Sequence, residues 1–218
     1  MEVDRIICGD CLEVMKDFPD NSVDLVLTDP PYGVGLGYDV YKDTKENWYR
    51  LIDPALPEMR RVGNMVILPC CQIKRLQWFY IGHKPDWLIC WYKGSTGCAS
   101  YIGFNDWEPH LVYGKNNNTM HDYFAVTNNE KMGNYGHPCP KPIGWALWLI
   151  HRSTKIGDLI LDPFCGSGTT CVAAKMLGRR YIGIEKSPNY CKIARKRIAA
   201  AEKGITVKEL EKGQKVLF

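Results

Sequence analysis

Two acidic turns, each directly after a short and mainly apolar run, are the segments of this chain best suited to chemistry. Asp29-Pro30-Pro31-Tyr32 follows the run 23–28, and the segment 162–168, which begins Asp162-Pro163, follows the run 158–161. In an open parallel α/β sheet, ligands bind just beyond the carboxyl ends of the strands. The pattern therefore predicts one cleft with two pockets.

The first turn offers hydrogen-bond acceptors. Its two prolines fix φ and lack N–H donors, which leaves the Asp29 carboxylate and the Pro30 carbonyl. Two acceptors that hold the hydrogens of an adenine or cytosine amino group would localise its lone pair, and methyl transfer then needs mainly positioning and electrostatics. Tyr32 gives a flat face on which the base could stack. A single Asp-Pro would favour a structural turn, but this tetrapeptide, with a second turn downstream, favours function.

The second turn is glycine-rich and leads into a predicted helix at 169–177. Free N–H groups at such a helix start bind phosphate or carboxylate, and Glu185, at the end of the next strand, could accept hydrogen bonds from ribose hydroxyls. The dinucleotide fingerprint has a third glycine where Cys171 stands here. The turn indicates a nucleoside cofactor and leaves NAD and S-adenosylmethionine open, while a tight turn without a ligand is disfavoured.

Composition limits the classes of function. The chain has 218 residues, 45% hydrophobic residues and a net charge of +4, which permits a polyanionic partner without requiring one. No apolar run approaches the roughly 20 residues of a membrane span, and the charged N-terminus lacks a signal-peptide core, so we expect a cytoplasmic protein. We interpret the ten cysteines as reduced thiols. Cys8 and Cys11 have CxxC spacing but no second pair, so no metal site is expected.

The hydrophobic pattern alternates strand and helix along one domain, 1–218. Because no helical pattern separates the predicted strands 87–92 and 108–113, we expect an antiparallel edge strand on a doubly wound, mostly parallel α/β sheet. Pro54 and Pro57 predict a kink or break in the helix near 48–59. The glycine-containing segment 33–47 is predicted to be a mobile loop, 93–136 an exposed connector or recognition segment, and 216–218 a terminal strand. The charge run 192–197 is interpreted as a solvated helix face.

The motifs together resemble the DNA amino-methyltransferases that modify adenine N6 or cytosine N4. Residues 29–32 are similar to their catalytic DPPY motif and 162–170 to their S-adenosylmethionine motif, in the circularly permuted "beta" order of the Rossmann-like methyltransferase sheet. The segment 137–142 resembles the one before the cofactor motif, although Cys139 and Pro140 depart from its usual pattern. Residues 7–11 resemble the N-terminal Gly-Asp turn of the family.

The resemblance implies a site-specific DNA adenine-N6 methyltransferase that uses S-adenosylmethionine and flips its target base out of the duplex. Cytosine N4 is the alternative target, although beta-ordered cytosine enzymes more often carry Ser at position 29. An NAD-dependent oxidoreductase and a non-catalytic nucleic-acid-binding module rank lower. The implied catalytic residues are Asp29, Pro30, Pro31 and Tyr32, and the implied cofactor-binding residues are Asp10, Lys141, Asp162, Phe164, Gly166, Ser167, Gly168, Thr169 and Glu185.

The same resemblance indicates partners and roles for the two irregular segments. Double-stranded DNA is the expected partner, with a homodimer and a cognate restriction endonuclease as further expectations and no membrane association. The loop 33–47 would be a lid over the flipped base, and 93–136 a small target-recognition insertion. Within it Lys93, Lys115, Asn116 and His121 could reach phosphates or base edges.

Overall fold

One mixed sheet organises the computed structural model, which describes residues 1–70, 73–94, 103, 106–115, 121–126 and 136–204. Within these ranges, eight strands form the sheet in the order β1-β8-β7-β2-β3-β5-β4-β6. The strands are β1 (Arg5–Cys8), β2 (Leu25–Leu27), β3 (Met65–Pro69), β4 (Trp87–Tyr92), β5 (Trp107–Gly114), β6 (Tyr123–Ala125), β7 (Leu159–Asp162) and β8 (Arg180–Glu185).

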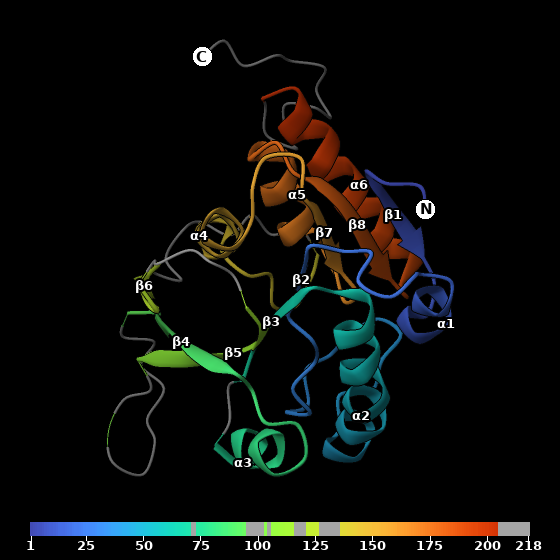
Figure 1. Ribbon diagram of the computed structural model, residues 1–218. Coiled ribbons are helices and arrows are strands. Elements are labelled where there is room, and N and C mark those ends of the chain that lie inside the picture. The colour runs from blue at the N-terminus through green and yellow to red at the C-terminus, as the bar shows by residue number, and fades with distance from the viewer. Residues whose placement is uncertain (71–72, 95–102, 104–105, 116–120, 127–135, 205–218) are drawn as a thin grey trace.

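Helices cover both faces of this sheet (Figure 1). On one face α4 (Ile143–Ser153), α5 (Thr169–Met176) and α6 (Pro188–Glu202) bury apolar side chains against the strands. On the other face α1 (Cys11–Lys16), α2 (Lys45–Val62) and α3 (Ile73–Gly82) enclose a second apolar cluster. The predicted doubly wound α/β architecture is confirmed.

The direction of the strands agrees with a mostly parallel sheet but differs in one detail. Strand β5 is antiparallel to both β3 and β4, and it lies between them, third from the edge rather than at the edge. The chain passes from β3 through α3 to β4, and β4 does not pair with β3 directly. The position between these two strands is filled by β5, which follows β4 in the chain. The outer edge of β4 then pairs in parallel with β6, a three-residue strand that its polar surroundings concealed in the sequence.

Helix α2 runs without interruption through Pro54 and Pro57, so of the predicted kink or break the break is wrong, and the kink stays a prediction. Thr44 caps the helix by accepting from the Asn47 N–H at 3.2 Å. One face of the helix, which includes the fully buried Ile52, packs against the sheet, and this burial offsets the two hydrogen bonds that the prolines remove. The predicted strand 216–218 lies outside the described residues.

The glycine-rich turn between β7 and α5 brings two helices into close contact. Gly168 adopts a left-handed conformation with φ of +84° directly before α5. A Cβ added at this position would lie 2.8 Å from the Cβ of Ala194 on α6. Two features therefore require a glycine at position 168: the positive φ of the backbone and the close approach of α6.

The first prediction concerns this packing. Gly168→Ala should lower the free energy of unfolding by about 1–3 kcal/mol, because the left-handed conformation and the contact with Ala194 both disfavour a Cβ. Urea denaturation measures the change. Gly82→Ala is the matched control, since a Cβ at that position, at the end of α3, meets no atom within 4 Å. An equal effect of both substitutions would contradict the assignment.

Candidate functional site

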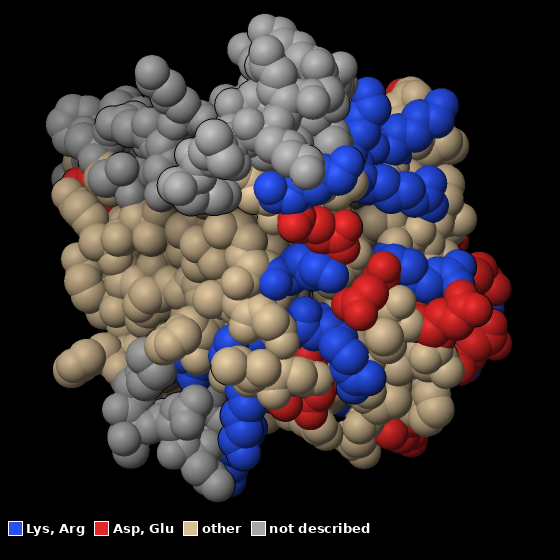
Figure 2. Space-filling model, turned by 90° about the horizontal axis from the view of Figure 1, so that it is seen from above, with Lys and Arg blue, Asp and Glu red and all other residues tan. Residues whose placement is uncertain are grey.

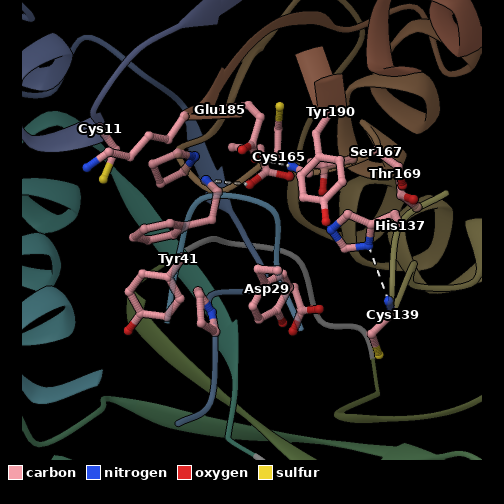
Figure 3. Close-up of a pocket in the computed structure, with 18 of the residues that line it drawn as sticks. Cys11, Asp29, Tyr41, His137, Cys139, Cys165, Ser167, Thr169, Glu185 and Tyr190 are labelled. Atoms are coloured by element: carbon pink, nitrogen blue, oxygen red, sulfur yellow. Dashed lines mark hydrogen bonds between the residues drawn. The ribbon is translucent and has the colours of Figure 1, made fainter. Parts of the chain in front are cut away.

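The two acidic turns leave the sheet side by side. Strands β2 and β7 are parallel neighbours, with Val26 paired to Leu161. One residue beyond β2, the Thr28 hydroxyl donates to Asp162 Oδ1 at 2.6 Å. A cavity of about 210 Å³ opens beyond both strand ends, and residues of both turns line it. Figure 3 shows Asp29 on one side of this cavity and Glu185, Ser167 and Thr169 on the other.

Asp29 lies in a group of paired charges. Its Oδ1 accepts from the Tyr32 hydroxyl at 2.5 Å and lies 3.1 Å from Lys141 Nζ. Lys141 Nζ also donates to the Tyr32 hydroxyl oxygen at 3.1 Å. Burial raises the pKa of Asp29, and the Lys141 ammonium opposes that rise. Lys141, which the resemblance assigns to the cofactor, therefore contacts the Asp29 turn directly.

Glu108 is a member of this group that the sequence analysis missed. It lies on β5, its side chain is 5% exposed, and its Oε1 accepts from the Tyr32 hydroxyl at 2.9 Å. Its Oε2 lies 3.3 Å from Lys93 Nζ, so Lys93 is bound within the site and does not project from it as a surface residue would. A carboxylate within an apolar strand was the available signal, but only the pairing of β5 with β3 brings it near Tyr32.

The glycine-rich turn is held by carboxylates at the ends of two strands. Glu185 accepts from the Gly166 N–H at 2.9 Å and from the Ser187 N–H at 2.7 Å. Asp162 accepts from Thr28 and from the Phe164 N–H, and burial raises its pKa to about 7. Opposite Gly166 stands the His137 ring, whose Nε2 would lie 2.8 Å from an added Cβ.

Arg197 fixes the same turn from α6. Its guanidinium donates to the Ser167 carbonyl at 2.7 Å, to the Ser167 hydroxyl at 2.8 Å and to the Thr169 hydroxyl at 3.1 Å. The interpretation of residues 192–197 as a solvated face is wrong for this residue, whereas Lys192 and Lys196 are exposed as expected. Figure 2 shows Lys and Arg gathered with acidic side chains over the α6 side of the molecule.

The predicted site residues converge on one cavity. Pro30, Tyr32 and Gly168 lie outside its lining, although Tyr32 contacts Asp29 and Gly168 begins α5. Asp10 lines it while capping α1 and pairing with Lys186 at 3.1 Å. The remaining predicted residues that line it are Asp29, Pro31, Lys141, Asp162, Phe164, Gly166, Ser167, Thr169 and Glu185.

Comparison with known proteins identifies the family. A family model described as DNA methylase, for N6 and N4 methyltransferases, matches residues 103–196. The chain is 35% identical over 213 residues to "Putative methylase YubD" of Escherichia coli K12, covering 92% of each chain. It is 29% identical over 248 residues to the type II methyltransferase M.HinfI of Haemophilus influenzae, covering 90% of this chain and 68% of that one.

The chain belongs to the DNA methylase family. Solved structures support the same fold. The M1.HpyAVI–SAM complex matches with a TM-score of 0.67 at 23% identity, over 89% of this chain and 98% of that one. The cytosine-N4-specific PvuII DNA methyltransferase matches with a TM-score of 0.71 at 18% identity, over 95% and 89%.

The segment 33–44 of this DNA methylase runs along the cavity between the Asp29 turn and α6. Buried Asp43 accepts from the N–H groups of Gly33, Val34 and Leu36 at 2.7–3.0 Å. Farther along, Asp39 accepts from the Ser187 hydroxyl at 2.5 Å. Tyr38, directly before Asp39, and Val40 and Tyr41, between Asp39 and Asp43, line the cavity. The segment thus covers the cavity, and its predicted mobility stays a prediction.

The sequence analysis expected neither a metal site nor a membrane span. Within the described ranges no group of three His, Cys, Asp or Glu side chains could hold a metal ion. None of the helices described is long and apolar enough to cross a membrane.

The second prediction concerns the Asp43 anchor. Asp43→Asn should speed hydrogen exchange at Gly33, Val34 and Leu36 about tenfold or more, because an amide NH₂ replaces one accepting oxygen and each bond to a charged acceptor contributes about 1.5–3 kcal/mol. Asp53→Asn, which changes an exposed carboxylate on α2, is the control. Unchanged exchange at all three amides would show that the carboxylate does not hold the segment.

Proposed function

We propose that this DNA methylase transfers a methyl group from S-adenosylmethionine to the N6 amino group of an adenine that has been flipped out of double-stranded DNA. The observation that carries the proposal is that the acceptor turn of Asp29 and the glycine-rich turn open on one cavity, joined by the Thr28–Asp162 hydrogen bond. A methyl donor and an acceptor amine must share one cavity for a direct transfer.

The residues around the cavity fit S-adenosylmethionine. Apart from Asp29, the carboxylates of Asp10, Asp162 and Glu185 line it, which suits a ligand that carries sulfonium and ammonium charges. Glu185 would accept the ribose hydroxyls, and Gly166, where an added Cβ would lie 2.8 Å from His137 Nε2, lets the His137 ring approach the turn. When bound, the cofactor supplies an electrophilic methyl group. Family membership favours this cofactor over the NAD alternative.

The catalytic turn would act through hydrogen-bond acceptance. The Asp29 carboxylate and the Pro30 carbonyl would take the two hydrogens of the target amine, and the Tyr32 ring would stack on the base. Pro30 is buried and Pro31 has no N–H, so no backbone donor of these two prolines competes for the acceptors, whereas the Tyr32 hydroxyl does donate to Asp29. Asp29 also faces the proton that the methylated amine must release.

Adenine is the proposed base because Asp, not Ser, stands at position 29. Cytosine N4 is the alternative, and the structural neighbour PvuII methyltransferase is cytosine-N4-specific. The order of the two motifs supports assignment to the permuted beta class. Digestion of DNA methylated by the protein, followed by mass spectrometry of the nucleosides, separates N6-methyladenine from N4-methylcytosine.

The remaining expectations are proposals about organisation and partners. We propose that residues 1–218 form one catalytic domain, in which 33–47 is a lid and 93–136 is the target-recognition segment. Strands β5 and β6, which lie within 93–136, belong to the eight-stranded sheet. Target recognition would therefore rest on the parts of 93–136 outside these two strands. Lys115 and His121 are exposed there, whereas Asn116 lies outside the described residues. A homodimer and a cognate restriction endonuclease remain part of the proposal.

The third prediction tests catalysis. Wild-type protein should transfer labelled methyl groups from S-adenosylmethionine to DNA as N6-methyladenine. Asp29→Ala should lower transfer at least 10²-fold, because it removes an acceptor of the amine, while cofactor affinity changes little. Asp53→Ala is the control. Substantial activity of the Asp29 variant would remove Asp29 from the mechanism, and label found only as N4-methylcytosine would change the target base.

The fourth prediction tests the cofactor turn. Arg197→Ala should weaken S-adenosylmethionine binding about tenfold or more, because the turn at Ser167 and Thr169 loses the hydrogen bonds that Arg197 donates to it. Isothermal titration calorimetry measures the affinity, and circular dichroism checks folding. Lys192→Ala, on the exposed side of the same helix, should bind as the wild type does. Equal affinities of the two variants would contradict this role.

A further inference from the structure

The Tyr32 hydroxyl is shared between two carboxylates. It lies 2.5 Å from Asp29 Oδ1 and 2.9 Å from Glu108 Oε1. A phenol has one proton, so it can donate to only one of these oxygens at a time. The Lys141 ammonium, 3.1 Å from the same hydroxyl oxygen, fills a third position around it. The site therefore holds two alternative partners for one donor.

Donation to Asp29 Oδ1 competes with the proposed chemistry at that oxygen. The Asp29 carboxylate must accept a hydrogen of the target amine, yet its Oδ1 faces both the Tyr32 hydroxyl and Lys141 Nζ. A hydroxyl that stays on Asp29 would compete with the amine for that oxygen. The hydroxyl needs a second acceptor, because a buried donor without a partner costs about 1–3 kcal/mol.

Glu108 is built to be that second acceptor. Its side chain is 5% exposed, with Lys93 Nζ at 3.3 Å and Lys141 Nζ at 3.9 Å. Burial raises the pKa of Glu108, but the ammonium groups of Lys141 and Lys93, with the hydrogen bond from Tyr32, hold it below its ordinary value. Burial raises the pKa of Asp29, and the negative charge of Glu108 adds to that rise. Of the two carboxylates, Glu108 is the one that a strand of the sheet and two ammonium groups hold in place.

We propose that Glu108 is a positioning residue, which takes over the Tyr32 hydroxyl when the target amine docks and thereby frees Asp29 Oδ1 for that amine. The inference rests on the proposed function. Since Glu108 is anchored in β5, the same bond would hold the Tyr32 ring while the base stacks on it. No bond of the reacting groups involves Glu108, so its effect should fall on the chemical step and not on cofactor binding.

A double-mutant cycle between Glu108 and Tyr32 tests this role. Single-turnover methylation would be measured at saturating S-adenosylmethionine and DNA, for wild type, Glu108→Gln, Tyr32→Phe and the double variant. We expect Glu108→Gln to lower the transfer rate tenfold or more when Tyr32 is present. In the Tyr32→Phe background, where no hydroxyl competes for Asp29, the same substitution should lower it less than threefold. Cofactor affinity should stay within twofold throughout.

Controls separate positioning from a general loss of structure. Glu58→Gln removes a paired carboxylate on α2, away from the cavity, and should leave the rate unchanged. If Glu108→Gln does not fold, Lys93→Gln replaces it, because loss of that ammonium loosens Glu108. Its smaller decrease in rate should also disappear in the Tyr32→Phe background.

The outcomes distinguish the inference from the function on which it rests. An active wild type with an unaltered Glu108→Gln variant overturns the inference alone. Equal losses in both Tyr32 backgrounds also overturn it, because they would show that Glu108 acts independently of the hydroxyl. A folded wild type that binds S-adenosylmethionine but methylates no DNA contradicts the proposed function as well.

Discussion

The parallel pairing of β2 with β7 is the constraint on which the rest of the site depends. The pairing ends in the hydrogen bond between Thr28 and Asp162, donated at 2.6 Å across residues that are far apart in the chain. Because both strands end at the same edge, the Asp29 turn and the glycine-rich turn face one cavity. A shift of either strand by one residue would exchange its inward and outward side chains and would misplace both turns.

The second constraint on the site is the need to pair its buried charges. Two carboxylates and two ammonium groups from four separate segments of the chain form one largely buried cluster of ion pairs. Its members are Asp29, Glu108, Lys93 and Lys141. An unpaired buried charge is strongly destabilising, so each member depends on the presence of the others. This dependence explains why Lys141, just before α4, lies beside Tyr32 rather than in open solvent.

The sequence predicts what local patterns determine. Asp29, Asp162 and Glu185 follow short apolar runs, and their positions at strand ends were predicted correctly from that fact alone. The position of β5 was not, because an antiparallel strand can pair at an edge or fill a gap with the same hydrophobic pattern, and the parallel strand β6 was missed because it has only three residues in polar surroundings. Glu108 and Arg197 were missed for the same reason, since their partners lie 76 and 28–30 residues away.

The covering segment 33–44 joins the two parts of the site into one unit. Near the Asp29 turn it is held by the buried carboxylate of Asp43, which accepts three backbone N–H groups. At its far side it is held by exposed Asp39, which accepts from Ser187 and Asn189 at the start of α6. Side-chain bonds at an exposed position compete with water, whereas the buried anchor does not. The segment is therefore fixed more firmly beside Asp29 than beside the glycine-rich turn.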